Sequence, residues 1–273
     1  MRRRKPDYMY DGNIEELFGP DGEIKYYEDL LLKRDQLQRE ANSIRISYMK
    51  EFGELTSNIF KCQTEIIKLK KTINAYQALI NRNEPIDVVA IDNAIENEMV
   101  GYILELKEMV DDTKHAKRCR RSNSYEIEAA KRIYRKIAKR IHPDINKVTE
   151  NNPELLEIWN QVMDAYYAND PGRLEELEVM INRLMKNMGD NTYEIDIANI
   201  DEKIGKIQKQ IQSIISSKPY IYNELLSDEN RIQKKKTEMK TELEESKSYI
   251  TELKGVIENL LTEGGATLTW QMN

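Results

Sequence analysis

The sequence predicts an all-α protein in which a central helical hairpin is flanked by long coiled-coil helices. Glycine and proline, the residues that helices tolerate worst, number only 11 and 7 among 273 residues. Charged residues make up 33% and aromatic residues 7%, a balance typical of elongated helices that each bury a narrow apolar stripe. Apolar residues also recur with heptad spacing on both sides of the middle of the chain.

The same composition disfavours several classes of function. No run of 18 apolar residues occurs, and the basic residues 2–5 are not followed by an apolar stretch, so we expect neither a membrane span nor a secretory signal. Cys62 and Cys119 form no CxxC or disulfide pattern, which favours a cytoplasmic location without a metal site. His115 and His142, the two histidines, have no nucleophile or phosphate loop beside them, so we expect neither enzymatic activity nor a cofactor.

The first third of the chain is predicted to form one long helix after a loose start. Turn-forming glycine and proline residues indicate that residues 1–22 are loosely ordered. A coiled-coil helix is expected over 23–83 and connecting helices over 84–122, with a break at Pro85. The seam of the coiled-coil helix consists of Leu37, Ala41, Ile44, Tyr48, Phe52, Leu55, Ile59, Cys62, Ile66, Leu69, Ile73, Tyr76 and Ile80.

The last third repeats the heptad pattern. We predict a coiled coil over 189–263, broken near Pro219, and a tail over 264–273. An apolar seam needs a partner helix, and the similar lengths of the two heptad regions favour an antiparallel intramolecular stalk that displays the middle of the chain. A homodimer is the alternative. Pro219 can mark either a kink or a hairpin that would give a three-helix bundle.

The central module is predicted over 123–188 from three helix-start signals. Asn123 begins a capping box, and the Asn-Pro and Asp-Pro pairs at 152–153 and 170–171 place proline at the first helical position. We therefore expect helices over 124–141, 153–168 and 171–186. The expected core of the module consists of Tyr134, Ile137, Ala138, Ile141, Trp159, Val162, Ala165 and Tyr166.

The loop after the first of these helices begins with His142-Pro143-Asp144. Proline cannot continue the helix and biases the preceding residue toward an extended conformation, so we expect a stiff corner that directs His142 and Asp144 outward. A carboxylate placed there can accept a charge-assisted hydrogen bond from an arginine of a partner. Residues 114–141 hold eleven Lys or Arg against two Glu, a surface that steers an acidic partner.

These residues resemble the J-domain of DnaJ-like co-chaperones. The chain reads YRKIAKRIHPDIN over 134–146 and WNQVMDAY over 159–166, similar to the family patterns Y-(K/R)-(K/R)-L-A-x-x-Y-H-P-D-x-N and F-x-x-I-x-x-A-Y. The resemblance implies a module that recruits and stimulates a DnaK-type chaperone ATPase. The positions it carries over as partner contacts are Lys131, Arg135, Lys136, Lys139, Arg140, His142, Pro143, Asp144 and Asn146.

The resemblance covers at most a quarter of the chain, and the sequence departs from the family in three respects. No Y-x-x-L-G motif precedes Asn123, Ile145 stands where a basic residue often follows HPD, and neither a Gly/Phe-rich linker nor CxxCxGxG repeats are present. We expect a specialised co-chaperone whose coiled-coil arms bind an unknown client. A coiled-coil scaffold with a degenerate J-like module is the alternative. Nucleic-acid binding through the basic helix is a third hypothesis, disfavoured because aromatic residues do not interleave with the cations.

Overall fold

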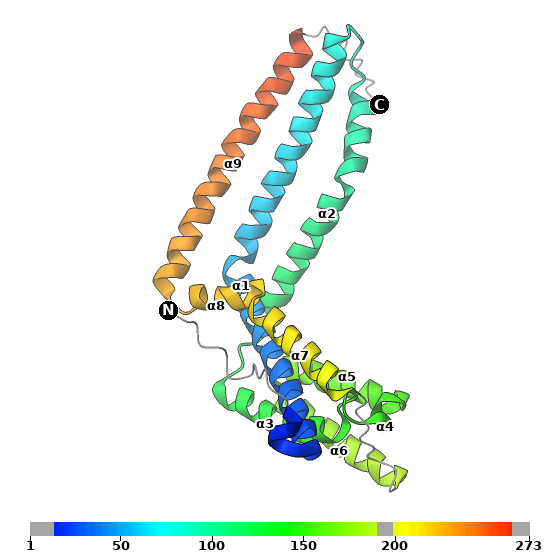
Figure 1. Ribbon diagram of the computed structural model, residues 1–273. Helices are drawn as coiled ribbons and strands as arrows, with labels where there is room; N and C mark the ends of the chain where they lie inside the picture. Colours follow the sequence, from blue (N-terminus) through cyan, green and yellow to red (C-terminus); the bar gives the residue numbers. More distant parts are fainter. Residues whose placement is uncertain (1–13, 190–198, 264–273) are drawn as a thin grey trace. The chain divides into compact units, whose positions relative to one another are not determined.

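The computed structural model describes residues 14–189 and 199–263, and all the regular structure in these ranges is helical (Figure 1), which confirms the all-α prediction. The helices are α1 (Ile14–Asn81), α2 (Val88–Arg118), α3 (Ser124–Ile141), α4 (Lys147–Glu150), α5 (Pro153–Tyr167), α6 (Pro171–Met188), α7 (Ile200–Ile215), α8 (Lys218–Leu226) and α9 (Glu229–Glu263). The tail expected over 264–273 and Ile197 of the second heptad region lie outside the described residues.

The chain divides into two compact units. Unit 1 comprises the chain up to Arg45 together with Arg120–Asn223, and unit 2 comprises Ile46–Cys119 together with the chain from Glu224 onward. Helix α1 therefore contributes its first part to one unit and its second part to the other. Sequence periodicity did not reveal this division, because the helix is continuous across it.

Helix α1 begins earlier than expected. The loose segment predicted over 1–22 is helical from Ile14 onward, so Gly19 and Pro20 lie inside the helix. Intrinsic helix propensity is a weak prior that tertiary packing overrides. The turns of α1 that follow Pro20 are stabilised by packing, and Leu31 in these turns is fully buried.

In unit 1, α3, α5 and α6 pack around one apolar core. The capping box is present, since the Glu126 backbone N–H donates to Asn123 Oδ1 and the Asn123 N–H donates to Glu126 Oε2, both at 2.9 Å. The Tyr134 and Tyr166 rings stack with their centroids 3.9 Å apart. All eight residues expected in the core of the module are buried. The predicted loop that begins at His142 contains the single helical turn α4.

Helix α1 packs against this module and against α7. Leu32 contacts the apolar core of the module. A second cluster consists of Tyr27, Leu30, Leu31 and Leu37 of α1, Ile204, Ile207 and Ile211 of α7, and Ile145. Pro219 lies in the first turn of α8, where it separates this short helix from α7.

In unit 2, α9 runs parallel to α1 rather than antiparallel as predicted (Figure 1). The contacts advance along both helices together, because Glu51 pairs with Lys236 at 2.7 Å and Glu65 pairs with Lys254 at 3.4 Å. The two helices bury a shared cluster of Phe52, Ile59, Ile232, Met239 and Leu243. A heptad seam shows that a helix needs a partner, but its spacing is the same for a parallel and an antiparallel partner. The similar lengths of the two heptad regions therefore did not determine the direction of α9.

The antiparallel neighbour of α1 in unit 2 is α2. Glu54 pairs with Lys117 at 2.8 Å and Lys68 pairs with Glu96 at 3.3 Å, so the contacts advance in opposite directions. The short connection between Asn81 and Val88 suits this arrangement, since antiparallel neighbouring helices are commonly joined by short loops. Close approach occurs at Gly53, where a Cβ atom would lie 2.5 Å from the Thr113 hydroxyl oxygen.

Candidate partner-docking site

The HPD corner is a tight, internally bonded turn at the end of α3. His142 is the C-cap residue with φ −63° and ψ 122°, the extended conformation that a following proline favours. Its carbonyl oxygen accepts the backbone N–H groups of Ile145 at 3.0 Å and Asn146 at 2.8 Å. The Asn146 side chain donates to the Arg140 carbonyl at 2.7 Å and caps α4. Hydrogen bonds within the chain therefore hold the corner as a tight turn.

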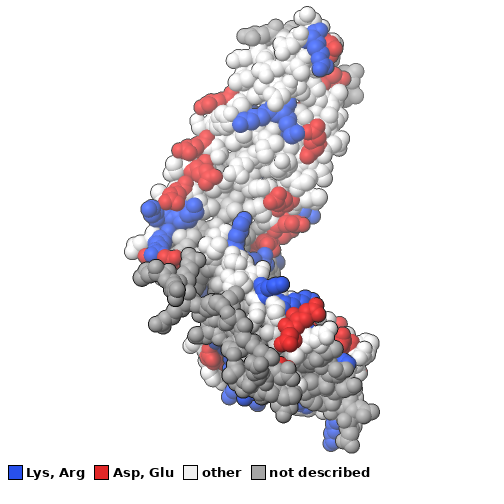
Figure 2. Space-filling view, in the orientation of Figure 1, with Lys and Arg blue, Asp and Glu red and all other residues white. Residues whose placement is uncertain are grey.

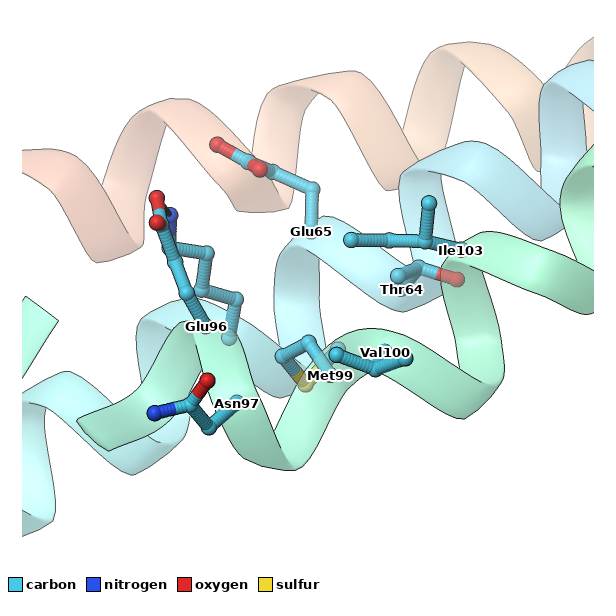
Figure 3. A pocket seen from close by; sticks show the side chains of 8 residues that line it. Thr64, Glu65, Glu96, Asn97, Met99, Val100 and Ile103 are labelled. Atoms are coloured by element: carbon cyan, nitrogen blue, oxygen red, sulfur yellow. Dashed lines mark hydrogen bonds and ion pairs between the residues drawn. The ribbon is translucent and has the colours of Figure 1, made fainter. Parts of the chain in front are cut away.

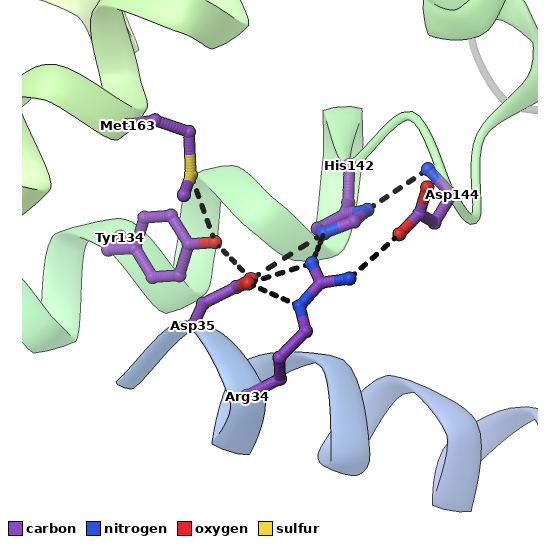
Figure 4. Close-up of polar contacts among 6 residues, drawn as sticks. All are labelled: Arg34, Asp35, Tyr134, His142, Asp144 and Met163. Atoms are coloured by element: carbon purple, nitrogen blue, oxygen red, sulfur yellow. Dashed lines mark hydrogen bonds and ion pairs between the residues drawn. The ribbon is translucent and has the colours of Figure 1, made fainter. Parts of the chain in front are cut away.

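His142 does not point outward, which corrects the sequence-based expectation. The residue is only 2% exposed, and its ring lies edge-on to Trp159 with the centroids 4.7 Å apart. Nδ1 accepts the Asp144 backbone N–H at 3.0 Å, which leaves the proton of a neutral ring on Nε2. Nε2 faces Asp35 Oδ2 at 3.5 Å (Figure 4). Packing of α1 over the corner is the physical reason for the burial, and the sequence pattern of the module carried no sign of it.

Arg34 of α1 bridges two carboxylates at this corner (Figure 4). Its guanidinium group contacts Asp35 Oδ1 through Nη2 at 2.7 Å and through Nε at 2.9 Å. Nη1 reaches Asp144 Oδ2 at 3.3 Å. The Asp144 side chain remains 45% exposed, whereas the Asp35 side chain is 3% exposed. Arg34 thus joins a buried ion pair to a partly exposed one.

Asp35 is the buried centre of the network. Tyr134 Oη donates to Asp35 Oδ2 at 2.6 Å, in addition to the contacts from Arg34 and His142. Burial by itself raises the pKa of the Asp35 carboxyl, but the hydrogen bonds and the positive charge around it outweigh burial, so the pKa lies below its usual range. Burial, followed by the nearby carboxylate, raises the pKa of Tyr134 well above its usual range.

Arg34 and Asp35 were not among the candidate residues found from the sequence. A usable signal was present, because Asp35 lies four residues after Leu31 and eight after Tyr27, on the apolar face of the same helix. A carboxylate in such a stripe requires a buried partner. The pattern does not identify those partners, which besides the adjacent Arg34 are Tyr134 and His142, both distant in the sequence.

The depressed pKa of Asp35 predicts a specific loss of stability in acid. Because the folded-state pKa lies below the unfolded value, of about 3.9, the ionised carboxylate stabilises the fold fully above that value. This contribution is lost as the pH falls through the folded-state pKa. We expect the free energy of unfolding, measured by urea titration, to fall less steeply between about pH 5 and pH 2 in Asp35→Asn than in the wild type. Asp29→Asn, at an exposed position of the same helix, should keep the wild-type slope, and identical slopes for all three proteins would contradict the assignment.

The candidate cations of α3 fall into two groups. Arg135, Lys136 and Lys139 are exposed on the face opposite the core. Lys131 and Arg140 are partly buried and have contacts within the chain. The exposed group therefore remains available to a partner.

The two partly buried cations hold neighbouring parts of unit 1. Lys131 pairs with Glu128 at 2.8 Å in the preceding turn of α3. Arg140 donates to Asn182 Oδ1 and contacts the Met185 sulfur at 3.3 Å, so it joins α3 to α6. Asn146 is 1% exposed. Like His142, Asn146 is used inside the fold, and the structure does not place it where a partner can reach it. Pro143 is half-buried.

Three of the cations before α3 pair with acids. Lys114 pairs with Asp111 at 3.2 Å, Lys117 pairs with Glu54, and Arg120 pairs with Glu126. On the face shown in Figure 2, basic and acidic side chains of unit 2 are interspersed. This pairing weakens the case for nucleic-acid binding, which requires a coherent basic surface.

A hollow in unit 2 lies between α1 and α2 and offers little chemistry (Figure 3). Its lining includes Thr64, Lys68, Glu96, Met99, Val100 and Ile103. Glu96 pairs with Lys68, and Glu65, also in the lining, pairs with Lys254. Within residues 14–189 and 199–263, no group of three or more His, Cys, Asp or Glu side chains is arranged to hold a metal ion. Nor does any helix in those ranges have both the length and the hydropathy needed to cross a bilayer.

Comparisons with known proteins add no relative from which a function could be transferred. No protein-family model, no curated protein and no solved structure matches the chain. Function therefore has to be inferred from the residues at the corner and on the exposed face of α3.

Proposed function

We propose that the chain is a co-chaperone in which a J-domain-like module, formed by α3 to α6, docks a DnaK-type ATPase. In this proposal the ATPase binds the exposed cations of α3 and the rim of the HPD corner. The helices of unit 2 act as coiled-coil arms that hold a client protein or an assembly. The module performs no chemistry itself and acts by binding one conformation of the ATPase better than another.

The observation that supports this proposal is the exposed cationic face of α3, together with the Asp144 carboxylate just beyond the end of that helix. Arg135, Lys136 and Lys139 project from the side of α3 that faces away from the core, and Asp144 keeps 45% of its side chain exposed. Such a face steers an acidic partner and fixes its orientation. A carboxylate at its end accepts an arginine of that partner.

His142 has a different role in this proposal from the one that its motif implies. Its imidazole is buried, so it cannot contact a partner in the conformation described. Nδ1 instead accepts the Asp144 backbone N–H and holds the backbone of Asp144 in the corner. We assign His142 as a positioning residue and Asp144 as the contact residue.

The second candidate function is a structural scaffold in which the module serves only as a packing unit. Specific observations favour it: His142 and Asn146 are 2% and 1% exposed and hold the corner together from inside. A J-like motif retained only for folding would keep just these contacts. The exposed cations of α3 are not required by this alternative.

Single-turnover ATP hydrolysis by a DnaK-type chaperone separates the two functions. We expect the wild-type chain to accelerate hydrolysis. Lys136→Glu should weaken the stimulation by roughly tenfold, since loss of charge steering reduces association on this scale. Asp144→Asn should weaken it by roughly the same factor, because it removes the charged acceptor for an arginine of the partner. Lys234→Glu, the same charge reversal at an exposed position of α9, is the matched control and should act as the wild type. Absence of acceleration at every protein concentration would leave the scaffold as the function.

A further inference from the structure

The first part of α1 covers the HPD corner from within the same chain. Leu31 is fully buried, and Tyr27 and Leu30 belong to the cluster that also buries Ile145, the residue that follows the HPD motif. Leu32 contacts the core of the module. The inner side of the corner is therefore occupied by this helix over about three turns.

Arg34 places a guanidinium group on the carboxylate that a partner would use. Nη1 lies 3.3 Å from Asp144 Oδ2, while Nη2 and Nε are engaged by Asp35 on the other side of the fork. Arginine is suited to this bridging because its donors are fixed in one plane. A second guanidinium arriving from outside would compete for Asp144 and would be repelled by the positive charge of Arg34. Arg34 and a partner arginine therefore compete for this carboxylate.

The two ion pairs of Arg34 differ in how easily they exchange. The pair with Asp35 is buried, with 3% of the Asp35 side chain exposed, so separating it is strongly unfavourable. The pair with Asp144 lies at the surface, with 45% of the Asp144 side chain exposed, and a pair of this kind contributes little to stability. An incoming arginine can thus replace Arg34 on Asp144 while Arg34 stays on Asp35.

Building on the proposed function, we propose that α1 is an autoinhibitory segment and that Arg34 occupies the place of the arginine of the ATPase. The partner has to displace Arg34 from Asp144, and its apparent affinity is the intrinsic affinity multiplied by the fraction of molecules in which Asp144 is uncovered. Docking is thereby coupled to the first part of α1, so that a ligand or client that shifts this helix changes how readily the ATPase binds.

The test is the concentration of the chain that gives half-maximal stimulation in single-turnover ATP hydrolysis by a DnaK-type chaperone. Arg34→Lys keeps a positive charge beside Asp35 but removes the fork that spans both carboxylates. We expect this variant to lower the half-maximal concentration roughly fivefold, the worth of one partly exposed ion pair. Arg34→Ala should lower it at least as far if the variant folds, as judged by circular dichroism. Lys25→Ala, at an exposed position of the same helix, should match the wild type.

Different outcomes overturn different claims. Stimulation by the wild type with an equal or higher half-maximal concentration for Arg34→Lys would overturn autoinhibition and leave the co-chaperone proposal standing. Absence of stimulation by the wild type, Arg34→Lys and Arg34→Ala alike would overturn the co-chaperone proposal, and autoinhibition with it. If Lys25→Ala lowered the half-maximal concentration as much as Arg34→Lys, autoinhibition would also be overturned. The effect would then not depend on the bridge that Arg34 forms between Asp35 and Asp144.

Discussion

Replacing Asp35 with alanine is expected to lower the free energy of unfolding by about 3–5 kcal/mol, because it removes one partner of a buried ion pair. The change leaves the Arg34 guanidinium without the carboxylate that holds it at 2.7 Å and leaves the Tyr134 hydroxyl without its acceptor at 2.6 Å. Both groups would remain near the interior with unmet hydrogen-bonding capacity. Urea or thermal unfolding followed by circular dichroism measures the loss.

Asp29→Ala is the matched control for this prediction. Asp29 lies on the same helix six residues earlier and is exposed. We expect its replacement to change the free energy of unfolding by no more than about 0.5 kcal/mol, as is usual for surface positions. A similar, small effect of both substitutions would show that Asp35 is not the centre of a buried network.

Replacing Phe52 with alanine is expected to lower the free energy of unfolding by about 3–5 kcal/mol, the range for truncating a buried aromatic side chain. Phe52 is fully buried in unit 2, where it shares a cluster with Ile232 and Met239 of α9, and its ring centroid lies 5.0 Å from that of Tyr48. The substitution leaves a cavity where the two parallel helices meet. Chemical unfolding followed by circular dichroism measures the effect.

Phe60→Ala makes the same chemical change on the same helix at a partly exposed position. Its effect should be clearly smaller, because less apolar surface returns to water and a partly exposed site leaves a smaller cavity. Equal losses for Phe52→Ala and Phe60→Ala would argue against the packing of α1 on α9 described for unit 2.

Local signals predicted the local structure of the chain well. The capping pair Asn123 and Glu126 marks the start of α3, and the Asn-Pro and Asp-Pro pairs mark the starts of α5 and α6. These signals depend on a few neighbouring residues and on backbone hydrogen bonds that the helix end leaves unmet. The eight core residues expected in the module are buried for the same reason, since a strong 3.6-residue period identifies the face that packs.

Features that depend on distant parts of the chain were predicted poorly. The heptad seam around Phe52 indicated a partner helix but not its direction, and α9 proved to be parallel. The exposure of His142 was inferred from Pro143 alone, whereas Arg34 and Asp35, more than a hundred residues earlier, decide it. A buried carboxylate on an apolar stripe is the one local sign that such a long-range contact exists.

Chemical modification of the two histidines tests the closed corner most directly. Diethylpyrocarbonate acylates accessible imidazole nitrogens, and the chain supplies an internal standard, because His115 is exposed whereas His142 is 2% exposed. Peptide mass spectrometry of the native wild-type chain over time should show prompt modification of His115 and little of His142, with both modified at similar rates in denaturant. Modification of both histidines at similar rates in the native chain would contradict the packing of α1 over the HPD corner.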